Sequence, residues 1–254
     1  MTDLVIESPA GAGHRGEGWR TAARGIGQLL ITLGVLILLF VVYELWGTGF
    51  YTQAQQHKLE TTIQQQWRGG SAPDVSTLPV DNVPLGTGIA VLFVPRLGQH
   101  YHFVVVEGTG YSDLQRGPGH YPGTAMPGQV GNFAVAGHRT TYQHPFKDIA
   151  NLRRGDYIVL ETKEHWFTYR IEDIPGANGT TVPWKEIVAP TDVQVAYPVP
   201  DQPDPAKAPT LKLLTFTSCH PEYSARERYV IHAMLVADDV KPQLPRALTT
   251  KPRS

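Results

Sequence analysis

The sequence contains a single cysteine, Cys219, among 254 residues. One cysteine cannot close an intramolecular disulfide, so no internal bridge is expected to stabilise the fold. Proteins outside the cell normally pair their cysteines or avoid them. Cys219 is therefore a small buried apolar residue, a partner in an intermolecular disulfide, or a residue kept for its reactivity.

Neither sign of charge is in excess, since 22 Lys and Arg residues face 23 Asp and Glu residues and the formal net charge is −1. A chain without an overall basic field has no general attraction for nucleic acid, so no nucleic-acid partner is expected. Glycine and proline, by contrast, are abundant, at 25 and 21 residues. Many turn-forming residues favour short strands joined by turns over a helical bundle.

Charged residues are almost missing from one long apolar run, Ile26 to Trp46, in which Glu44 is the one charged residue. The run is long enough to cross a bilayer as a helix. A cleaved signal peptide has a shorter apolar region and a small-residue cleavage site, and a core helix of a soluble protein has a polar face. We therefore expect an uncleaved transmembrane anchor at 26–46, in contact with membrane lipid, after a polar tail at 1–25.

Basic residues lie mainly on one side of this run. Arg15, Arg20 and Arg24 precede it, whereas Lys58 is the one Lys or Arg within about twenty residues after it. Cytoplasmic flanks of membrane helices carry the excess of Lys and Arg. The tail is therefore expected in the cytoplasm, and the chain after Trp46 is expected outside the cell membrane.

The segment after the anchor divides into a helix and a linker. Tyr51 to Trp67 has good helix formers and no breaker, which predicts a short polar helix rather than an unstructured stalk. Arg68 to Gly88 is rich in Gly, Pro, Ser and Asp, which is typical of a linker. We expect residues 47–84 to form a stalk and linker, and residues 241–254 to form a polar C-terminal tail.

From residue 85 to residue 240, short β-rich runs alternate with turn signals. The intervals compatible with a helix, Pro145 to Asn151 and Trp184 to Val188, are too short to be the crossover helices of a parallel sheet. The pattern predicts a mainly β domain, a mostly antiparallel barrel or sandwich. The eight predicted strands are IAVLFVP, HFVVVEG, NFAVAG, DYIVLET, WFTYRIEDI, DVQVAYPV, LKLLTFTS and RYVIHAMLVAD.

The surroundings of Cys219 favour reactivity over burial. The cysteine follows the run LKLLTFTS, at a strand end, where barrels display functional groups. A reactive thiolate needs a cationic or hydrogen-bonding environment and a proton carrier. Arg226 and Arg228 come just before the next strand and share one side of an extended chain, so a returning strand can bring either of them to the thiol.

The proton carrier has to be chosen among ten histidines. His220 is adjacent to Cys219, but consecutive residues of an extended chain face opposite sides. His138 ends an apolar strand after a glycine that permits a sharp turn, so it is the better candidate. His100 and His102 form an H-x-H on one strand face but lack a third ligand at recognisable spacing, so we expect surface residues and neither a metal site nor a cofactor.

Two of these runs, AVAGHRTTY and TFTSCHPEYSARERYVIHA, resemble the paired signatures of the sortases. Sortases are membrane-anchored cysteine transpeptidases of Gram-positive bacteria, and the resemblance is to their class E branch in actinobacteria. The runs GHYPGTAMPGQVGN and FKDIANLRRGDYIVLET resemble the connecting segments of the family. The resemblance covers Leu85 to Ala237 with the N-terminal anchor, and it implies a sortase-like eight-stranded β-barrel with short helices, the catalytic domain at 85–240.

The resemblance also implies a role for each candidate. By position, Cys219 is the nucleophile, His138 is the general acid, and Arg228 supports the oxyanion. Arg226 competes for the last role, and periodicity does not separate the two arginines. The similarity to class E favours Arg228, which directly precedes the apolar strand.

The family pattern before the nucleophile is Thr-Leu-x-Thr-Cys, and residues 215–219 read TFTSC. Phenylalanine in place of leucine keeps an apolar filler, and Ser218 in place of threonine keeps the hydroxyl but loses a methyl group. Catalysis is therefore expected to be retained, whereas substrate contact beside the thiol is altered. Thr217, Ser218 and Arg226 are the candidates for substrate binding.

The reaction implied by the family is a transpeptidation. The Cys219 thiolate would attack the Thr–Gly bond in the C-terminal sorting signal of a surface protein, and His138 would protonate the departing amine. An amino group of a peptidoglycan precursor would then resolve the thioester and attach the surface protein to the cell wall. Class E enzymes prefer Leu-Ala-x-Thr-Gly over Leu-Pro-x-Thr-Gly.

Two alternative functions stay open. Pilus-polymerising sortases often carry a lid with an Asp-Pro-aromatic motif and a second, C-terminal span. Here APDVSTLPVDNVP offers Asp-Val and the C-terminal tail is polar, which favours general anchoring of surface proteins. The other alternative is a catalytically inactive, membrane-tethered β-barrel that binds wall polymers, for which Cys219 would be dispensable.

Overall fold

The computed structural model describes residues 17–43, 48–70, 73–176, 179–201 and 208–250. The chain divides into two compact units, Met1–Leu45 and Trp46–Ser254. In the first unit, helix α1 (Glu17–Val42) contains the one helical stretch of the described residues that is long and apolar enough to cross a membrane. This helix agrees with the predicted anchor, whose residues 44–46 lie outside the described residues.

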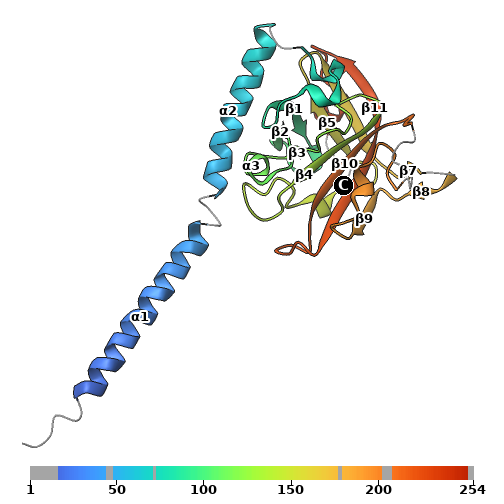
Figure 1. Cartoon of the computed structure of the whole chain (residues 1–254). Helices are drawn as coiled ribbons and strands as arrows, with labels where there is room; N and C mark the ends of the chain where they lie inside the picture. The colour runs from blue at the N-terminus through green and yellow to red at the C-terminus, as the bar shows by residue number, and fades with distance from the viewer. Residues whose placement is uncertain (1–16, 44–47, 71–72, 177–178, 202–207, 251–254) are drawn as a thin grey trace, which may run out of the picture. The chain divides into compact units, whose positions relative to one another are not determined.

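Eight strands of the second unit close into a barrel (Figure 1). Their order is β10-β4-β3-β2-β1-β5-β6-β11, β11 pairs back onto β10, and β9 is added beside β11. In this sheet, β4 runs parallel to β10 and β3 runs parallel to β2, and the other neighbouring pairs are antiparallel. The prediction of a mainly β, mostly antiparallel eight-stranded barrel is confirmed.

The elements of the second unit have the following bounds. The barrel strands are β1 (Gly88–Phe93), β2 (His102–Glu107), β3 (Gly119–His120), β4 (Gly131–Gly137), β5 (Tyr157–Glu161), β6 (His165–Ile171), β10 (Lys212–His220) and β11 (Glu227–Val240). The other strands are β9 (Lys185–Val188) and the hairpin β7 (Ile174–Pro175) and β8 (Thr181–Val182). The α-helices are α2 (Thr48–Arg68), α3 (Tyr111–Leu114) and α4 (Arg246–Thr249).

Large apolar side chains fill the inside of the barrel, and they alternate along each strand. Leu214 and Phe216 of β10, Val135 of β4, and Tyr229 and Ile231 of β11 belong to one buried core cluster. The residues between them in each strand therefore point to the outer face of the sheet. This alternation decides which face carries each predicted site residue.

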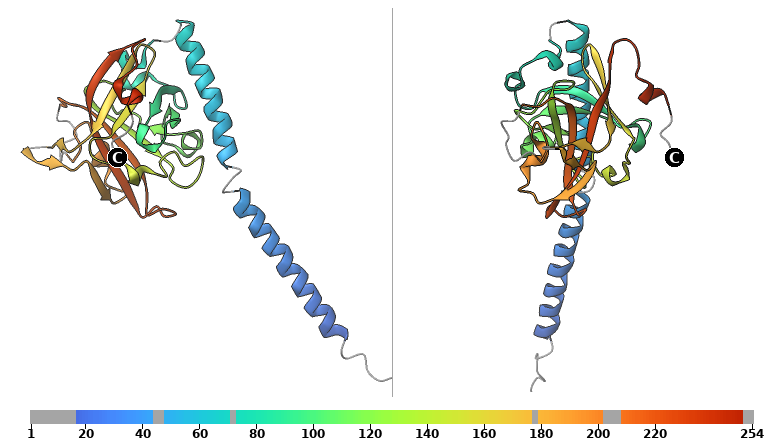
Figure 2. Two further views of the ribbon diagram at one scale, coloured as in Figure 1. Left: turned by 180° about the vertical axis from the view of Figure 1, so that it is seen from behind. Right: turned by 90° about the vertical axis from the view of Figure 1, so that its right-hand side faces the viewer.

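Helix α2 lies along the outside of the barrel (Figure 2). Leu59 and Ile63 are buried against valines of β1 and β2. The Gln56 side chain accepts from the N–H of Val104 at 2.6 Å and donates to its carbonyl at 3.0 Å. The predicted polar helix is present. One side of it is buried against the barrel, whereas a stalk would be exposed to solvent on all sides.

This packing predicts a stability effect at Ile63, which is 3% exposed. Ile63→Ala is expected to lower the free energy of unfolding of the exterior domain by about 2 to 4 kcal/mol, because it leaves a cavity between α2 and the barrel. Urea unfolding of the domain with residues 47–254 measures this. Gln65→Ala, an exposed position on the same helix, is the control and should change little. Equal, small effects of both substitutions would mean that α2 does not pack on the barrel.

The linker after α2 crosses one end of the barrel. The Asp74 carboxylate accepts from the Thr162 hydroxyl at 2.9 Å, and the Gln129 side chain donates to the carbonyls of Ser76 and Leu78 at 3.0 and 2.8 Å. Gln129 comes just before β4 begins. These contacts place residues 74–78 of the linker near the end of the barrel where β4 starts.

One predicted strand is wrong. The run DVQVAYPV, expected to be a strand, forms a short 3-10 helix, η7 (Val193–Ala196), outside the sheet, where the Asn132 side chain donates to the carbonyls of Val195 and Tyr197. The interval 184–188, which is compatible with a helix by sequence, forms β9, and its backbone pairs with β11. The other seven predicted strands are confirmed, and the two-residue strand β3 is an addition.

Candidate active site

Three neighbouring strands bring the predicted catalytic residues to one end of the barrel. The β10–β4 ladder ends at the pair Ser218 and Gly137, so the next residues, Cys219 and His138, are neighbours. On the other side of β10, Cys219 is the direct partner of Arg228 in β11. The three residues lie 81 and 9 positions apart in the chain, yet they are adjacent across three strands.

The three side chains also share a face. Phe216 points into the core, so Cys219, three residues later in the same strand, points outward. His138 follows Val135 of the core by three residues, and Arg228 precedes the buried Tyr229 by one. Sulfur, imidazole and guanidinium therefore project from the outer face of the sheet at one end.

Cys219 itself is a free cysteine with intermediate exposure. A thiol sealed in the core would have no access to a substrate, whereas this one borders solvent. The first of the three roles open to a lone cysteine, the buried apolar residue, does not fit this position.

His138 is enclosed more than an ordinary surface histidine. Its Nε2 atom is buried, and no residue that the structure describes forms a hydrogen bond with it. The Tyr142 ring packs over the imidazole with centroids 5.1 Å apart, and the Tyr142 hydroxyl meets that of Tyr111 at 2.8 Å. Burial lowers the pKa of His138 because it disfavours the imidazolium ion. The ring is therefore mostly neutral at pH 7.

The two candidate arginines differ in position. Arg228 lies inside β11, and its Nη1 donates to the carbonyls of Ala225 and Glu227 at 3.1 Å each. Arg226 precedes the strand and is exposed, and its backbone N–H donates to the Ser224 hydroxyl at 3.3 Å. The strand register thus brings Arg228, and not Arg226, directly opposite the cysteine.

The two hydroxyl residues before the cysteine lie on opposite faces. Thr217 shares the outer face with Cys219, and its Oγ1 lies 2.8 Å from the hydroxyl of Tyr121. Ser218 is on the inner face, 3% exposed, and its hydroxyl donates to the Gly137 carbonyl at 2.8 Å. Thr217 is therefore beside the thiol, whereas the Ser218 hydroxyl holds two strands together.

Sequence reasoning missed Arg139, the residue after His138. Its side chain is 8% exposed, and its Nη1 donates to the carbonyl of Cys219 at 3.3 Å. The available signal was the motif GHR itself, in which an arginine directly follows an apolar strand and the candidate histidine.

His100 and His102 stay apart from this site. Both are exposed, and the Nδ1 atom of His102 lies 2.9 Å from the carbonyl oxygen of His100. Over the described ranges, no three His, Cys, Asp or Glu side chains are grouped so that they could hold a metal ion.

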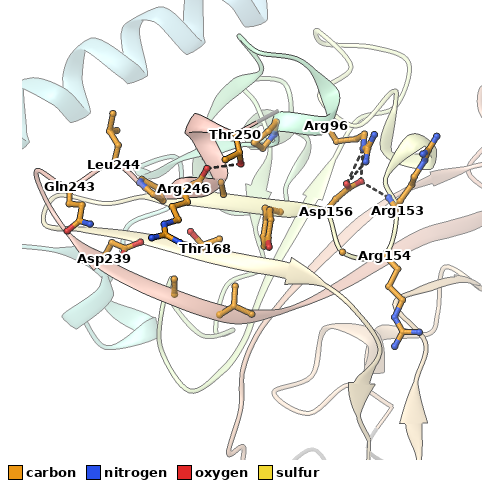
Figure 3. Close-up of a pocket in the computed structure, with 17 residues that line it drawn as sticks. Arg96, Arg153, Arg154, Asp156, Thr168, Asp239, Gln243, Leu244, Arg246 and Thr250 are labelled. Carbon is orange, nitrogen blue, oxygen red and sulfur yellow. Dashed lines mark hydrogen bonds and ion pairs between the residues drawn. The ribbon is translucent and has the colours of Figure 1, made fainter. Parts of the chain in front are cut away.

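A cavity of about 670 Å³ lies away from this site. Figure 3 shows it between the C-terminal segment with α4 and the strands β5, β6 and β11. Among its charged side chains, Arg96 pairs with Asp156 at 2.7 Å and Arg154 pairs with Asp173 at 3.1 Å. None of the three catalytic candidates lines this cavity.

Comparison with known proteins identifies the family. The family model described as "Sortase domain" matches residues 92–236, more than half of the chain. The chain belongs to the sortase family. It is 36% identical over 226 residues to sortase SrtE1 of Streptomyces coelicolor, covering 85% of this chain and 58% of that protein. It is 31% identical to sortase SrtE2 of the same organism, covering 92% of each.

A solved structure agrees with these relatives. Sortase E from Streptomyces avermitilis superposes with a TM-score of 0.54 at 40% identity, covering 65% of this chain and 99% of that one. The protein is therefore an enzyme, a sortase-type cysteine transpeptidase with class E homologues. Its N-terminal apolar helix fits the membrane anchoring of sortases.

Proposed function

We propose that this sortase cleaves the Thr–Gly bond of C-terminal sorting signals through a thioester on Cys219 and joins the surface protein to an amino group of a peptidoglycan precursor. The observation that carries the proposal is the strand register, in which Cys219 pairs with Arg228 and adjoins His138 on one outer face. The relatives of class E support the same type of reaction.

In the first half-reaction, the Cys219 thiolate attacks the threonine carbonyl carbon and the carbonyl oxygen takes the negative charge. Arg228, whose guanidinium donates to the carbonyls of Ala225 and Glu227 in the free enzyme, turns to donate to this oxyanion. The carbon–nitrogen bond then breaks, and the imidazolium of His138 gives its proton to the departing amine. The product is an acyl thioester on the enzyme.

In the second half-reaction, the incoming amine attacks the thioester carbonyl. His138, now neutral, accepts the proton that this amine loses, and the carbon–sulfur bond breaks to return the thiolate. Each residue thus returns to its starting state. No metal or cofactor is proposed for either half-reaction.

We also propose the orientation that the flanking charges predict, with residues 1–25 in the cytoplasm and the catalytic domain outside. Arg20 and Arg24 lie in α1 before its apolar stretch. In this arrangement, the domain at 85–240 meets exported proteins on the outer side of the membrane.

Incubation of the exterior domain with Leu-Ala-x-Thr-Gly and Leu-Pro-x-Thr-Gly peptides plus an amine tests the function. Mass spectrometry is expected to detect cleavage after threonine and a new amide with the amine, faster for the Leu-Ala peptide. Absence of both products with every sorting-signal peptide would reject the proposal.

The rate is expected to depend on pH in a bell shape. The reaction needs a thiolate on Cys219 together with an imidazolium on His138. Because burial lowers the pKa of His138, its imidazolium fraction falls as the pH rises through neutrality, while the thiolate fraction rises. The kcat/KM of transpeptidation should therefore pass through a modest maximum that reflects the coupled pair. A flat profile from about pH 6 to 9 would contradict this pairing.

A further inference from the structure

The backbone ladder between β4 and β10 stops one residue before the catalytic pair. Its last pair is Ser218 with Gly137, so Cys219 and His138 are not themselves a ladder pair. Catalysis between two side chains is sensitive to displacements of about 1 Å. Contacts between side chains beyond the last pair therefore add to the alignment of the two strand ends.

A second layer of three side chains lies directly beneath the catalytic layer. Arg139, His220 and Tyr229 each come one residue after a catalytic candidate, so each points from the inner face of the same strand end. Arg139 Nη1 lies 3.1 Å from His220 Nδ1, and its guanidinium lies 5.5 Å from the centroid of the Tyr229 ring. The His220 and Tyr229 rings are 5.7 Å apart. The three side chains touch one another across β4, β10 and β11.

Arg139 is the centre of this inner layer. Besides His220 and Tyr229, its Nη1 reaches the carbonyl of Cys219 at 3.3 Å, and the side chain is 8% exposed. The Ser218 hydroxyl of β10 in turn donates to the carbonyl of Gly137 in β4. A side chain following β4 therefore contacts the backbone of β10, and a side chain of β10 contacts the backbone of β4.

The charge of Arg139 makes this arrangement specific. An arginine N–H can only donate, so His220 accepts at Nδ1 and carries its proton on Nε2. The guanidinium contacts a carbonyl, an imidazole nitrogen and an aromatic face, none of which carries a formal negative charge. A buried cation is costly to desolvate, and these three contacts offset that cost only while the three strand ends stay together.

We propose that Arg139, with His220 and Tyr229, is a positioning residue that holds Cys219, His138 and Arg228 in reacting geometry. This inference rests on the proposed transpeptidase function. Arg139 does not reach the reacting atoms from the inner face. Its side chain positions Cys219 by a hydrogen bond to the Cys219 carbonyl. Its backbone positions His138, because the two residues are adjacent in the chain.

The test compares Arg139→Met and Arg139→Lys with Arg154→Met, a control at an arginine that is 63% exposed. Arg139→Met is expected to lower kcat by about 10- to 100-fold with KM within about twofold, because misalignment affects the chemical step. Arg139→Lys should recover part of the loss, since an ammonium still donates to the carbonyl. Arg154→Met should match the wild type. Hydrogen exchange of the segment 217–221 should speed up in Arg139→Met and not in the control.

The outcomes separate this inference from the proposed function. If the wild type transfers sorting-signal peptides and folded Arg139→Met does so at the same kcat, the positioning role is wrong and the transpeptidase function stands. If the wild type transfers no peptide, the function fails, and hydrogen exchange still decides whether Arg139 holds the strand ends. Should Arg139→Met fail to fold, Arg139→Lys decides. Wild-type kcat and exchange in that variant would overturn the proposal, and reduced kcat with faster exchange in segment 217–221 would support it.

Discussion

Cys219→Ala is expected to abolish transpeptidation, with a loss of at least about 10⁴-fold in kcat/KM. Without the sulfur no thioester forms, and the half-reactions have no shared intermediate. The melting temperature should change by only a few degrees, because the side chain is partly exposed and alanine removes one atom from the outer face of the sheet. Peptide transfer followed by mass spectrometry, with thermal unfolding in parallel, measures both quantities.

This substitution also separates the enzyme from the inactive wall-binding barrel. A binding module would retain its ligand affinity in Cys219→Ala and would show no transfer in the wild type either. Transfer by the wild type that persists in the variant at more than about 1% of the rate would mean that another residue is the nucleophile.

His138→Gln is expected to lower kcat by about 10²- to 10⁴-fold. Glutamine approximates the size of the ring and keeps hydrogen-bonding groups, but it cannot carry a proton to the departing amine. The bell-shaped pH dependence should lose the limb that falls as the pH rises, because the group with the burial-lowered pKa is gone. Steady-state rates from about pH 5 to 9 measure both effects.

The matched control is His100→Gln. His100 is exposed and is distant in the sequence from the three strand ends that carry the candidate residues. It should leave the rate and the pH profile unchanged. A His138→Gln variant that is folded and keeps both the rate and the complete profile would remove His138 from the mechanism. His220 would then be the histidine to examine next, because it adjoins Cys219.

Seven of the eight predicted strands are confirmed, because each combines β-branched or aromatic residues with turn signals on both sides. The failures come from partners remote in the chain. The run DVQVAYPV has the composition of a strand, but Asn132, about 60 residues earlier, binds its carbonyls outside the sheet. The run at 184–188 is short enough to suit either state, and its pairing with β11 decides for a strand.

The sequence also predicts part of the candidate site. Motif and strand-end reasoning named Cys219 and His138 as candidates, and the fold brings these two residues together. Periodicity left two arginines, since residues two apart share a face. The family resemblance favoured Arg228, and the register of β10 against β11 pairs Arg228 with the cysteine. The motif GHR marks the position of Arg139, but not its contacts, because the partners of its side chain lie 80 and more residues further along the chain.

Capture of the acyl-enzyme tests the central claim most directly. The exterior domain is mixed with a Leu-Ala-x-Thr-Gly peptide without an amine, quenched in acid, and weighed intact before and after proteolysis. We predict an adduct with the mass of the peptide acyl group up to threonine, located on the fragment that contains Cys219 and removed by hydroxylamine. Cleavage of the peptide with no adduct on that fragment, or an adduct on another residue, would contradict the account.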